Sequence, residues 1–456
     1  MNLKPYPEYK VSGVAWLGKV PKHWEMRKFR TILTPIAERN RPDLPLLSVV
    51  REKGVIKRNI KDDSENHNYI PDDLSNYKVV KSGQFAMNKM KAWQGSYGIS
   101  KFDGIVSPAY FVFDLKCIEP DFFHKAVRSR AYVPFFTQAS DGVRVGQWDL
   151  SQTRMKEMPF GVPSTPEQTQ IARFLDYKTA QIARFIKAKK RMIELLKEQK
   201  QVIINDAVTG KIVIKDEGGR LKAEKRLDSS FLPQPSSFLQ TVPEGWEVRR
   251  LKFVASMKSG DNITSETIEE QGDYPVYGGN GLRGYTSSFT HEGLHILIGR
   301  QGALCGNINY TTEGKFWASE HAVVVSPKID IDLFWFGELL KAMNLNQYSI
   351  AAAQPGLSVD RILNLFIPFP GYNEQKRISE SIKKQTASLA LTISRTEREI
   401  GLMQEYRTRL VSDVVTGKID VRDIEIPDIA GIDDTLDESI DEPEGEEELE
   451  TAEAEE

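Results

Sequence analysis

Glycine clusters are the first residues in this sequence with the spacing of a cofactor site. Gly279, Gly281 and Gly284 match the Gly-x-Gly-x-x-Gly pattern that cradles the phosphates of a dinucleotide. Such a site also needs a strand directly before the glycines and a helix directly after them. We expect neither element from residues 274–277 or 285–288, so a turn or a recognition loop is the favoured interpretation.

Other patterns that could support catalysis are incomplete in the same way. The Thr-Gly-Lys-Ile tetrapeptides at 209–212 and 416–419 lack the upstream glycine and the Ser/Thr of a P-loop, and are typical of turns that end helices. The six histidines form no pair at metal-ligand spacing, and Cys117 and Cys305 lie far apart. Residues 107–110, Ser-Pro-Ala-Tyr, lack the Asn/Asp-Pro-Pro-aromatic signature of an amino-methyltransferase. We therefore predict no catalytic site, no cofactor and no metal in this chain.

Basic, amide and aromatic residues in glycine-rich stretches are the best candidates for a binding site. Arg and Lys side chains can contact guanine or phosphate, and Gln can pair with adenine. For each residue, a structural role or a contact with phosphate alone is the alternative to base recognition. The candidates for contact with a nucleic acid are Lys89, Lys91, Trp93, Gln94, Arg144, Gln147, Arg283, Arg300 and Gln301.

The charge distribution agrees with a polyanionic partner. Residues 423–456 hold 17 of the 64 acidic residues and no Lys or Arg. This leaves 47 acidic residues against 61 basic ones on residues 1–422, a net charge of +14 that suits nucleic acid. The acidic end has few aromatic residues and is predicted to be disordered, either as a solvated tail or as a competitor for the basic surface.

The composition predicts a cytoplasmic protein with two or three folded domains. The chain has 456 residues, of which 40% are hydrophobic and 27% are charged. It contains no run of 18 apolar residues, and residues 1–10 lack the apolar core of a signal peptide, so we expect neither membrane association nor export. The isolated cysteines fit a reducing compartment.

A search for internal repeats shows that the chain is duplicated. Residues 20–29, with Val-Pro at the start and Trp-Glu in the middle, recur as residues 242–251. Further along, residues 150–212 and 357–419 share Leu-Ser, Glu-Gln and Thr-Gly-Lys-Ile sequences at an offset of 207. The residues between these two echoes are dissimilar. Each copy is thus predicted to be a shared frame around an individual insert.

Each frame ends in a sequence with the pattern of a long helix. Apolar residues recur every three or four positions from Leu175 to Ala207 and from Ile382 to Val414, with polar interruptions at matching positions. This heptad register predicts an antiparallel coiled coil roughly 60 Å long. Two separate amphipathic helices, each packed on its own domain, are the alternative.

The two inserts are predicted to be mixed α/β. Short apolar runs such as Tyr110–Phe113 and Ala322–Val325 alternate with Gly, Asn and Ser turns. The predicted boundaries are two α/β domains at 1–162 and 242–369, helical spacers at 163–212 and 370–420, a linker at 213–241 and an acidic tail at 421–456.

Several short phrases occur in a fixed order along the two copies. They are Ser12–Gly18 followed by Val20–Glu25, Asn88–Gly95 with Gly104–Tyr110, Tyr274–Gly281, Gly299–Ala303, Gln354–Ser358 and both Thr-Gly-Lys-Ile sequences. In their order and duplication, these phrases resemble the specificity (S) subunit of type I restriction-modification enzymes. The resemblance covers about residues 10–420.

The resemblance implies two target-recognition domains that each read one half of an asymmetric, bipartite site in double-stranded DNA. The long helices would set the gap between the halves and dock two modification (adenine methyltransferase) subunits. Those partners and the restriction (helicase-nuclease) subunits would supply S-adenosylmethionine binding, base flipping, ATP use and cleavage in defence against phage. The chain itself would be non-catalytic. The alternatives are a coiled-coil adaptor that binds proteins through its inserts, and a diverged, self-sufficient DNA nuclease or methyltransferase.

Overall fold

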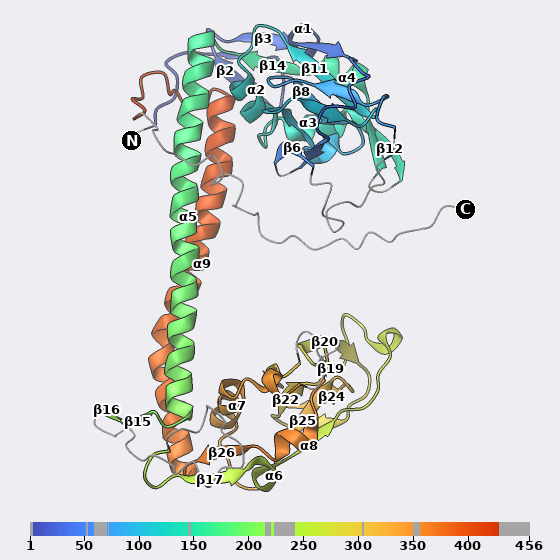
Figure 1. The fold of residues 1–456 in the computed structure, drawn as a ribbon. Helices are drawn as coiled ribbons and strands as arrows, with labels where there is room; N and C mark the ends of the chain where they lie inside the picture. The colour runs from blue at the N-terminus through green and yellow to red at the C-terminus, as the bar shows by residue number, and fades with distance from the viewer. Residues whose placement is uncertain are drawn as a thin grey trace. The chain divides into compact units, whose positions relative to one another are not determined.

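Two compact units make up the described part of the chain. The computed structural model describes residues 3–51, 53–58, 71, 73–144, 147–214, 220–222, 242–302, 305–349 and 356–427. The first unit contains Met1–Lys190 with Glu397–Glu456, and the second contains Arg191–Thr396. Each unit therefore joins one insert to parts of both long helices (Figure 1).

The first insert, its frame and the first long helix consist of short strands followed by one very long helix. The strands are β1 (Tyr9–Val11), β2 (Lys19–Pro21), β3 (Glu25–Lys28), β4 (Leu33–Ile36), β5 (Leu47–Val50), β6 (Gly54–Lys57), β7 (Lys78–Val80), β8 (Phe85–Asn88), β9 (Tyr97–Ile99), β10 (Gly104–Val106), β11 (Tyr110–Leu115), β12 (Ser140–Arg144), β13 (Gln147–Leu150) and β14 (Pro159–Val162). The helices are α1 (Phe29–Ile32), η1 (Ala92–Gln94), α2 (Pro120–Val127), α3 (Val133–Gln138), α4 (Gln152–Lys156) and α5 (Thr165–Val208).

The second copy repeats this plan. Its strands are β15 (Ile212–Ile214), β16 (Arg220–Lys222), β17 (Glu247–Arg250), β18 (Ala255–Ser259), β19 (Tyr274–Gly278), β20 (Gly281–Thr286), β21 (His291–Glu292), β22 (Ile296–Gly299), β23 (Ile308–Tyr310), β24 (Lys315–Ala318), β25 (Ala322–Pro327) and β26 (Phe366–Phe369). Its helices are α6 (Leu251–Val254), η3 (Ser265–Thr267), α7 (Leu333–Ala342), η4 (Leu345–Tyr348), α8 (Val359–Leu363) and α9 (Tyr372–Val415).

Each insert contains a sheet with the same arrangement of strands, even though the sequences of the two inserts are dissimilar. Unit 1 contains a four-stranded antiparallel sheet in the order β4-β11-β8-β9, and unit 2 contains the same arrangement as β18-β25-β22-β23. The remaining strands differ, since unit 2 adds the sheet β20-β19-β24-β21, whereas the other strands of unit 1 that the structure describes form two-stranded pairs. The predicted mixed α/β class is confirmed, and the difference between the inserts lies in what surrounds the common sheet.

Each common sheet packs against a helix and so buries its own core. In unit 1, the ring of Phe123 on α2 meets the ring of Phe85 on β8 edge to face, with 5.2 Å between centroids. In unit 2, Trp335 on α7 and Val325 on β25 belong to a separate buried cluster. Because each cluster is large and fully apolar, each unit has the core of an independent domain.

The helices α2 and α7 occupy the same place in the two units. A carboxylate caps each of them, since Glu119 and Asp332 accept a hydrogen bond from a backbone N–H of the first helical turn. The backbone N–H of each capping residue donates to a buried glutamine on a long helix, Gln168 in unit 1 and Gln375 in unit 2. These matching contacts align α2 with α7 residue by residue.

The two 44-residue helices pair as the heptad pattern predicts. In unit 1, Leu175 near the start of α5 shares a buried cluster with Leu410 near the end of α9. In unit 2, Ile204 near the end of α5 shares a cluster with Ile382 near the start of α9. Within each unit the helices therefore run antiparallel (Figure 1).

Polar residues in the heptad stripe are satisfied without breaking the helices. The hydroxyls of Thr179 and Thr386 each donate to the carbonyl four residues earlier, at 2.8 Å. Lys189 Nζ lies 2.7 Å from a carboxylate oxygen of Glu399 on the other helix. The matching polar interruptions thus fit a paired coil, and the alternative of two separate amphipathic helices is wrong.

The predicted helix-ending turns are confirmed, and each one packs on the other copy. Gly210 and Gly417 have φ values of 75° and 76°, the left-handed conformation that favours glycine. A Cβ on Gly417 would lie 2.3 Å from Pro21 Cδ, and a Cβ on Gly210 would lie 2.5 Å from Pro243 Cγ. The turn that ends each long helix therefore packs closely against the Val-Pro sequence in the frame of the other copy.

Few of the predicted linker and tail residues are described. Of the linker, the structure describes 213–214 and 220–222, and of the tail it describes 421–427, where Val421 is buried in the core of unit 1. The predicted disorder of the acidic tail concerns mainly residues 428–456, which lie outside the described residues. No described helix is long and apolar enough to cross a membrane.

Candidate nucleic-acid interface

The first insert brings two predicted contact stretches together. The carbonyl of Lys89, just after β8, accepts a hydrogen bond from the N–H of Leu150 at the end of β13 (3.0 Å). Lys89 Nζ also lies 2.9 Å from the carboxylate of Asp149. The loop after β8 is therefore held against the β12–β13 hairpin, which carries the second predicted stretch.

In this loop one residue packs against an aromatic ring of the hairpin, while another is exposed to solvent. Trp93 is half-buried in η1, and its ring centroid lies 5.3 Å from that of Trp148 on β13. Within the described part of the chain, the indole Nε1 of Trp93 has no hydrogen-bond partner. Lys91 is exposed and Gln94 is half-buried beside it. Trp93 thus supports the hairpin, while Lys91 is open to a partner.

The hairpin itself carries Arg144 and Gln147. The two residues face each other across the β12–β13 pair through their backbones. Their side chains lie outside the described part of the structure, so their contact with DNA stays a prediction.

The second insert also brings two predicted stretches together. Arg283 is exposed on β20, and its side chain runs along Gly278, where a Cβ would lie 2.5 Å from Arg283 Cδ. A Cβ on Gly279 would lie 3.1 Å from the carbonyl oxygen of His321. The same carbonyl accepts a hydrogen bond from the N–H of Arg300 at 2.9 Å. The β19–β20 hairpin and the loop after β22 therefore lie side by side, and both carry an arginine.

Amide side chains complete this loop cluster. Asn307 Nδ2 donates to Asn280 Oδ1, and Asn309 Nδ2 donates to the carbonyl of Gly279, both at 3.3 Å. Gln301 is exposed on the same loop, and Asn280 and Asn307 are exposed beside it. Sequence patterns do not point to the three asparagines, because Asn is common in turns and carries no spacing signal there. Amide and guanidinium groups on one surface match the hydrogen-bonding groups of base edges and phosphates.

The glycine pattern of the second insert is a hairpin turn. Contrary to expectation, a strand does precede it, since β19 ends at Gly278. The residues that follow form β20, not the helix whose N-terminus a dinucleotide phosphate would need. Gly281 and Gly284 have φ values of 97° and 150°, so the glycines serve the hairpin's backbone.

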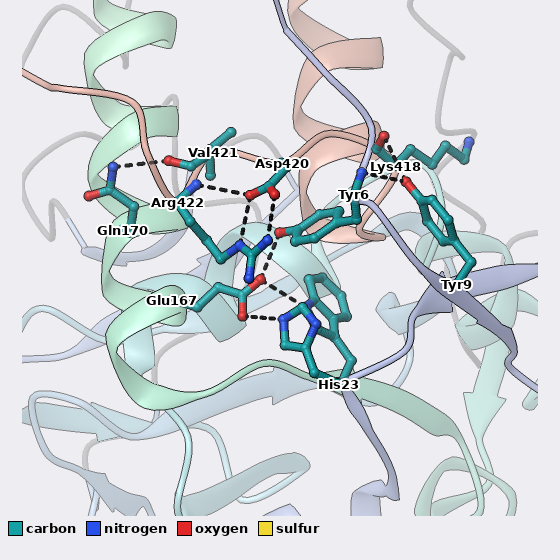
Figure 2. Close-up of polar contacts among 10 residues, drawn as sticks. Tyr6, Tyr9, His23, Glu167, Gln170, Lys418, Asp420, Val421 and Arg422 are labelled. Atoms are coloured by element: carbon teal, nitrogen blue, oxygen red, sulfur yellow. Dashed lines mark hydrogen bonds and ion pairs between the residues drawn. The ribbon is translucent and has the colours of Figure 1, made fainter.

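A buried carboxylate holds the frame of unit 1 together. Glu167 lies in the first turn of α5 and is only 4% exposed. Its Oε1 accepts hydrogen bonds from Tyr6 Oη (2.7 Å) and Trp24 Nε1 (2.9 Å), and its Oε2 lies 2.8 Å from His23 Nε2 (Figure 2). Burial and the adjacent carboxylate raise the pKa of Tyr6, so its phenol remains a donor.

The two ends of the described chain meet at this carboxylate. The N–H of Asp420, just after α9, donates to the carbonyl of Lys4 at 2.8 Å. Arg422 binds both carboxylate oxygens of Asp420 (2.9 and 2.7 Å) and lies 5.0 Å from the ring centroid of Tyr6 (Figure 2). Burial alone would raise the pKa of Asp420, but the hydrogen bonds from Arg422 outweigh it and lower the pKa.

Replacing this carboxylate should destabilise unit 1 selectively. A Glu167→Ala variant leaves Trp24 Nε1 and Tyr6 Oη buried without their acceptor, at an expected cost of about 2 to 4 kcal/mol in the free energy of unfolding. The equivalent Glu374 is half-buried and, among the described residues, its side chain makes no hydrogen bond, so Glu374→Ala is the matched control. Urea unfolding followed by tryptophan fluorescence measures both variants. Equal losses in the two would contradict the role assigned to Glu167.

Metal binding has no visible basis in the described residues. In that part of the chain, no group of three or more His, Cys, Asp and Glu side chains is placed to hold a metal ion. The carboxylate of Glu167 is instead occupied by protein groups, since it contacts Tyr6, His23 and Trp24.

Comparisons with known proteins match parts of the chain to type I restriction specificity proteins. A family model described as the type I restriction modification DNA specificity domain matches residues 243–400. The EcoprrI specificity subunit, from a type I restriction enzyme of Escherichia coli, is 44% identical over 150 residues, which are 32% of this chain and 37% of that relative. The matched segment thus spans little more than a third of that relative's length.

A solved structure resembles a much larger part of the chain. It comes from work on complex assembly and conformational transition of the type I R-M system, and the alignment has a TM-score of 0.59. It covers 87% of this chain and 98% of the other at 16% identity, so it supports the fold. Residues 243–400 of the chain therefore match the type I restriction modification DNA specificity domain, and the fold as a whole resembles a protein of the type I R-M system.

Proposed function

We propose that this chain is the non-catalytic, DNA-sequence-recognition subunit of a type I restriction-modification complex. One observation carries this function: two units share the same core sheet but present different loop clusters of basic, amide and aromatic residues. Two domains that each recognise a different DNA sequence need a common scaffold with loops of their own. We call these two DNA-recognition domains the heads.

The two heads, residues 1–162 and 242–369, would each read one half of a bipartite site in double-stranded DNA. In the first head the contacts come from Lys91 and the β12–β13 hairpin, and in the second from Arg283, Arg300 and the neighbouring amides. Because the loops of the two heads differ, the recognised site is asymmetric. The paired spacers, residues 163–212 and 370–420, set the length of the gap.

The long helices would also dock the partner subunits. Leu195 on α5 and Leu402 on α9 occupy equivalent heptad positions on the outer faces and are 49% and 59% exposed. Exposed leucines at matching positions on both helices suit two copies of one partner. We assign this surface to two modification subunits, which supply the methyl-transfer chemistry and recruit the restriction subunits in the cytoplasm.

The purified chain should bind duplex DNA but neither methylate nor cut it. Incubation with labelled S-adenosylmethionine and duplex should give no transfer, whereas addition of the modification subunits should restore it. Binding by the chain should weaken steeply as salt rises, because phosphate contacts release counterions. Methyl transfer that follows the chain through two unrelated purification schemes would refute this function, and so would an absence of duplex binding at low salt.

A further inference from the structure

A basic groove lies in unit 2, where α7 meets the end of α5 and the start of α9. It has a volume of about 490 Å³ and opens to solvent. Figure 1 shows α7 beside the two long helices. The residues of the groove that matter here are Lys197, Lys200, Phe334, Glu338, Lys341 and Lys383.

Two of the four lysines in this groove, Lys200 and Lys383, are not neutralised by an ion pair among the described residues. The single carboxylate, Glu338, is buried and accepts hydrogen bonds from Lys341 Nζ (2.7 Å) and Tyr310 Oη (3.0 Å). Burial and the adjacent Glu338 raise the pKa of Tyr310, so the phenol remains a donor. Within the described part of the chain, Lys200 and Lys383 have no ion-pair partner.

The equivalent place in unit 1 has a different charge. The capping contacts align Glu338 of α7 with Lys125 of α2, and the offset of 207 aligns Lys383 with Asp176. In unit 1, Lys125 Nζ and the Asp176 carboxylate form an ion pair with each other. At these two positions unit 1 therefore holds an ion pair, whereas in unit 2 Lys383 has no ion-pair partner among the described residues and Glu338 pairs with Lys341.

The groove is joined to the loop cluster of the second head by one short strand. Asn309 of β23 donates to the carbonyl of Gly279 in the loop cluster. The next residue, Tyr310, donates to Glu338 in the groove. Adjacent residues of β23 therefore connect the loop cluster to the groove.

We propose that this groove binds backbone phosphates of the DNA that the second head reads. The inference rests on the proposed function and adds a positioning site to it. Lysines on flexible stems are suited to contact phosphates as point charges, and such contacts fix register without reading sequence. An acidic segment of a partner that docks twice would need the same groove in both units, whereas asymmetric DNA can use it in one.

Removing the two lysines without ion-pair partners tests the assignment. In the complex with modification subunits, a Lys200→Ala, Lys383→Ala variant should bind every duplex about tenfold more weakly at low salt, and its salt slope should be shallower by about 1 to 2. The methylated sequence should stay the same. A Lys376→Ala, Lys384→Ala variant is the matched control, because these exposed lysines on α9 do not line the groove and the charge change is equal.

The possible outcomes separate this inference from the proposed function. A salt slope reduced in the groove variant but not in the control supports phosphate binding. Equal slopes in both variants overturn it, and a variant that no longer retains modification subunits assigns the groove to a protein partner instead. If the unmodified complex fails to bind duplex DNA at all, the proposed function itself fails.

Discussion

A double variant, Ile193→Asp with Ile400→Asp, is expected to abolish methylation of the target site while leaving each head folded. Both isoleucines belong to the inward stripe of the long helices and are only 8% and 9% exposed. An aspartate at either position would be buried in an apolar seam without a partner, at a cost of several kcal/mol for each carboxylate. In the proposed function, the spacing of the heads and the docking surface for partners both depend on that seam.

The measurement is methylation by the reconstituted complex, with limited proteolysis to show that both heads stay compact. Gln181→Asp with Ser394→Asp is the control, because these residues are exposed on the same two helices. Normal methylation by the buried-site variant would contradict the coiled-coil account. Loss of activity in the control variant would show that added charge alone disrupts the complex.

The long helices could be predicted from sequence because their signal is local. A heptad repeat over some 40 residues reports burial directly, and Thr-Gly-Lys at the end of each stripe marks a left-handed stop. Even the polar interruptions were informative, because Thr179 and Thr386 satisfy their hydroxyls within their own helices.

The common sheet could not be predicted because several of its strands carry no alternation. The central strands β8 and β22 are buried along nearly their whole length, so both faces are apolar. Short runs of this kind look alike in helices and strands, and the two inserts share no residues that would align them. Their equivalence becomes visible only through backbone pairing and the matching caps on α2 and α7.

Contacts between residues far apart in the chain also could not be predicted from the sequence. Nothing local predicts that Gly417 packs on Pro21, or that Asp420 pairs with Lys4. For the same reason, the sequence placed Arg283 and Arg300 in separate stretches, whereas the fold sets their loops side by side. Residue type and glycine content predicted the candidates, and tertiary packing decided which of them share a surface.

Exchanging one insert should change one half of the recognised site. Residues 251–365 can be replaced by the matching insert of another specificity subunit, because this exchange leaves β17 and β26 paired in the frame. Each unit has its own core, so the new head should fold on the old frame. Base contacts are local to a head, whereas the gap depends on helices that the exchange leaves intact.

Replacement of residues 29–158 is the mirror-image control. That exchange ends before β14 and leaves β3 and β14 paired in the first frame. It should change the other half of the site and keep the half that the first exchange altered.

Sequencing of methylated bases across the genome of cells that carry each chimera tests the central claim most directly. Division of recognition between two heads predicts that one half of the motif changes while the other half and the gap stay as they were. A change in both halves, or in the gap alone, would contradict it and show that recognition is shared along the whole chain.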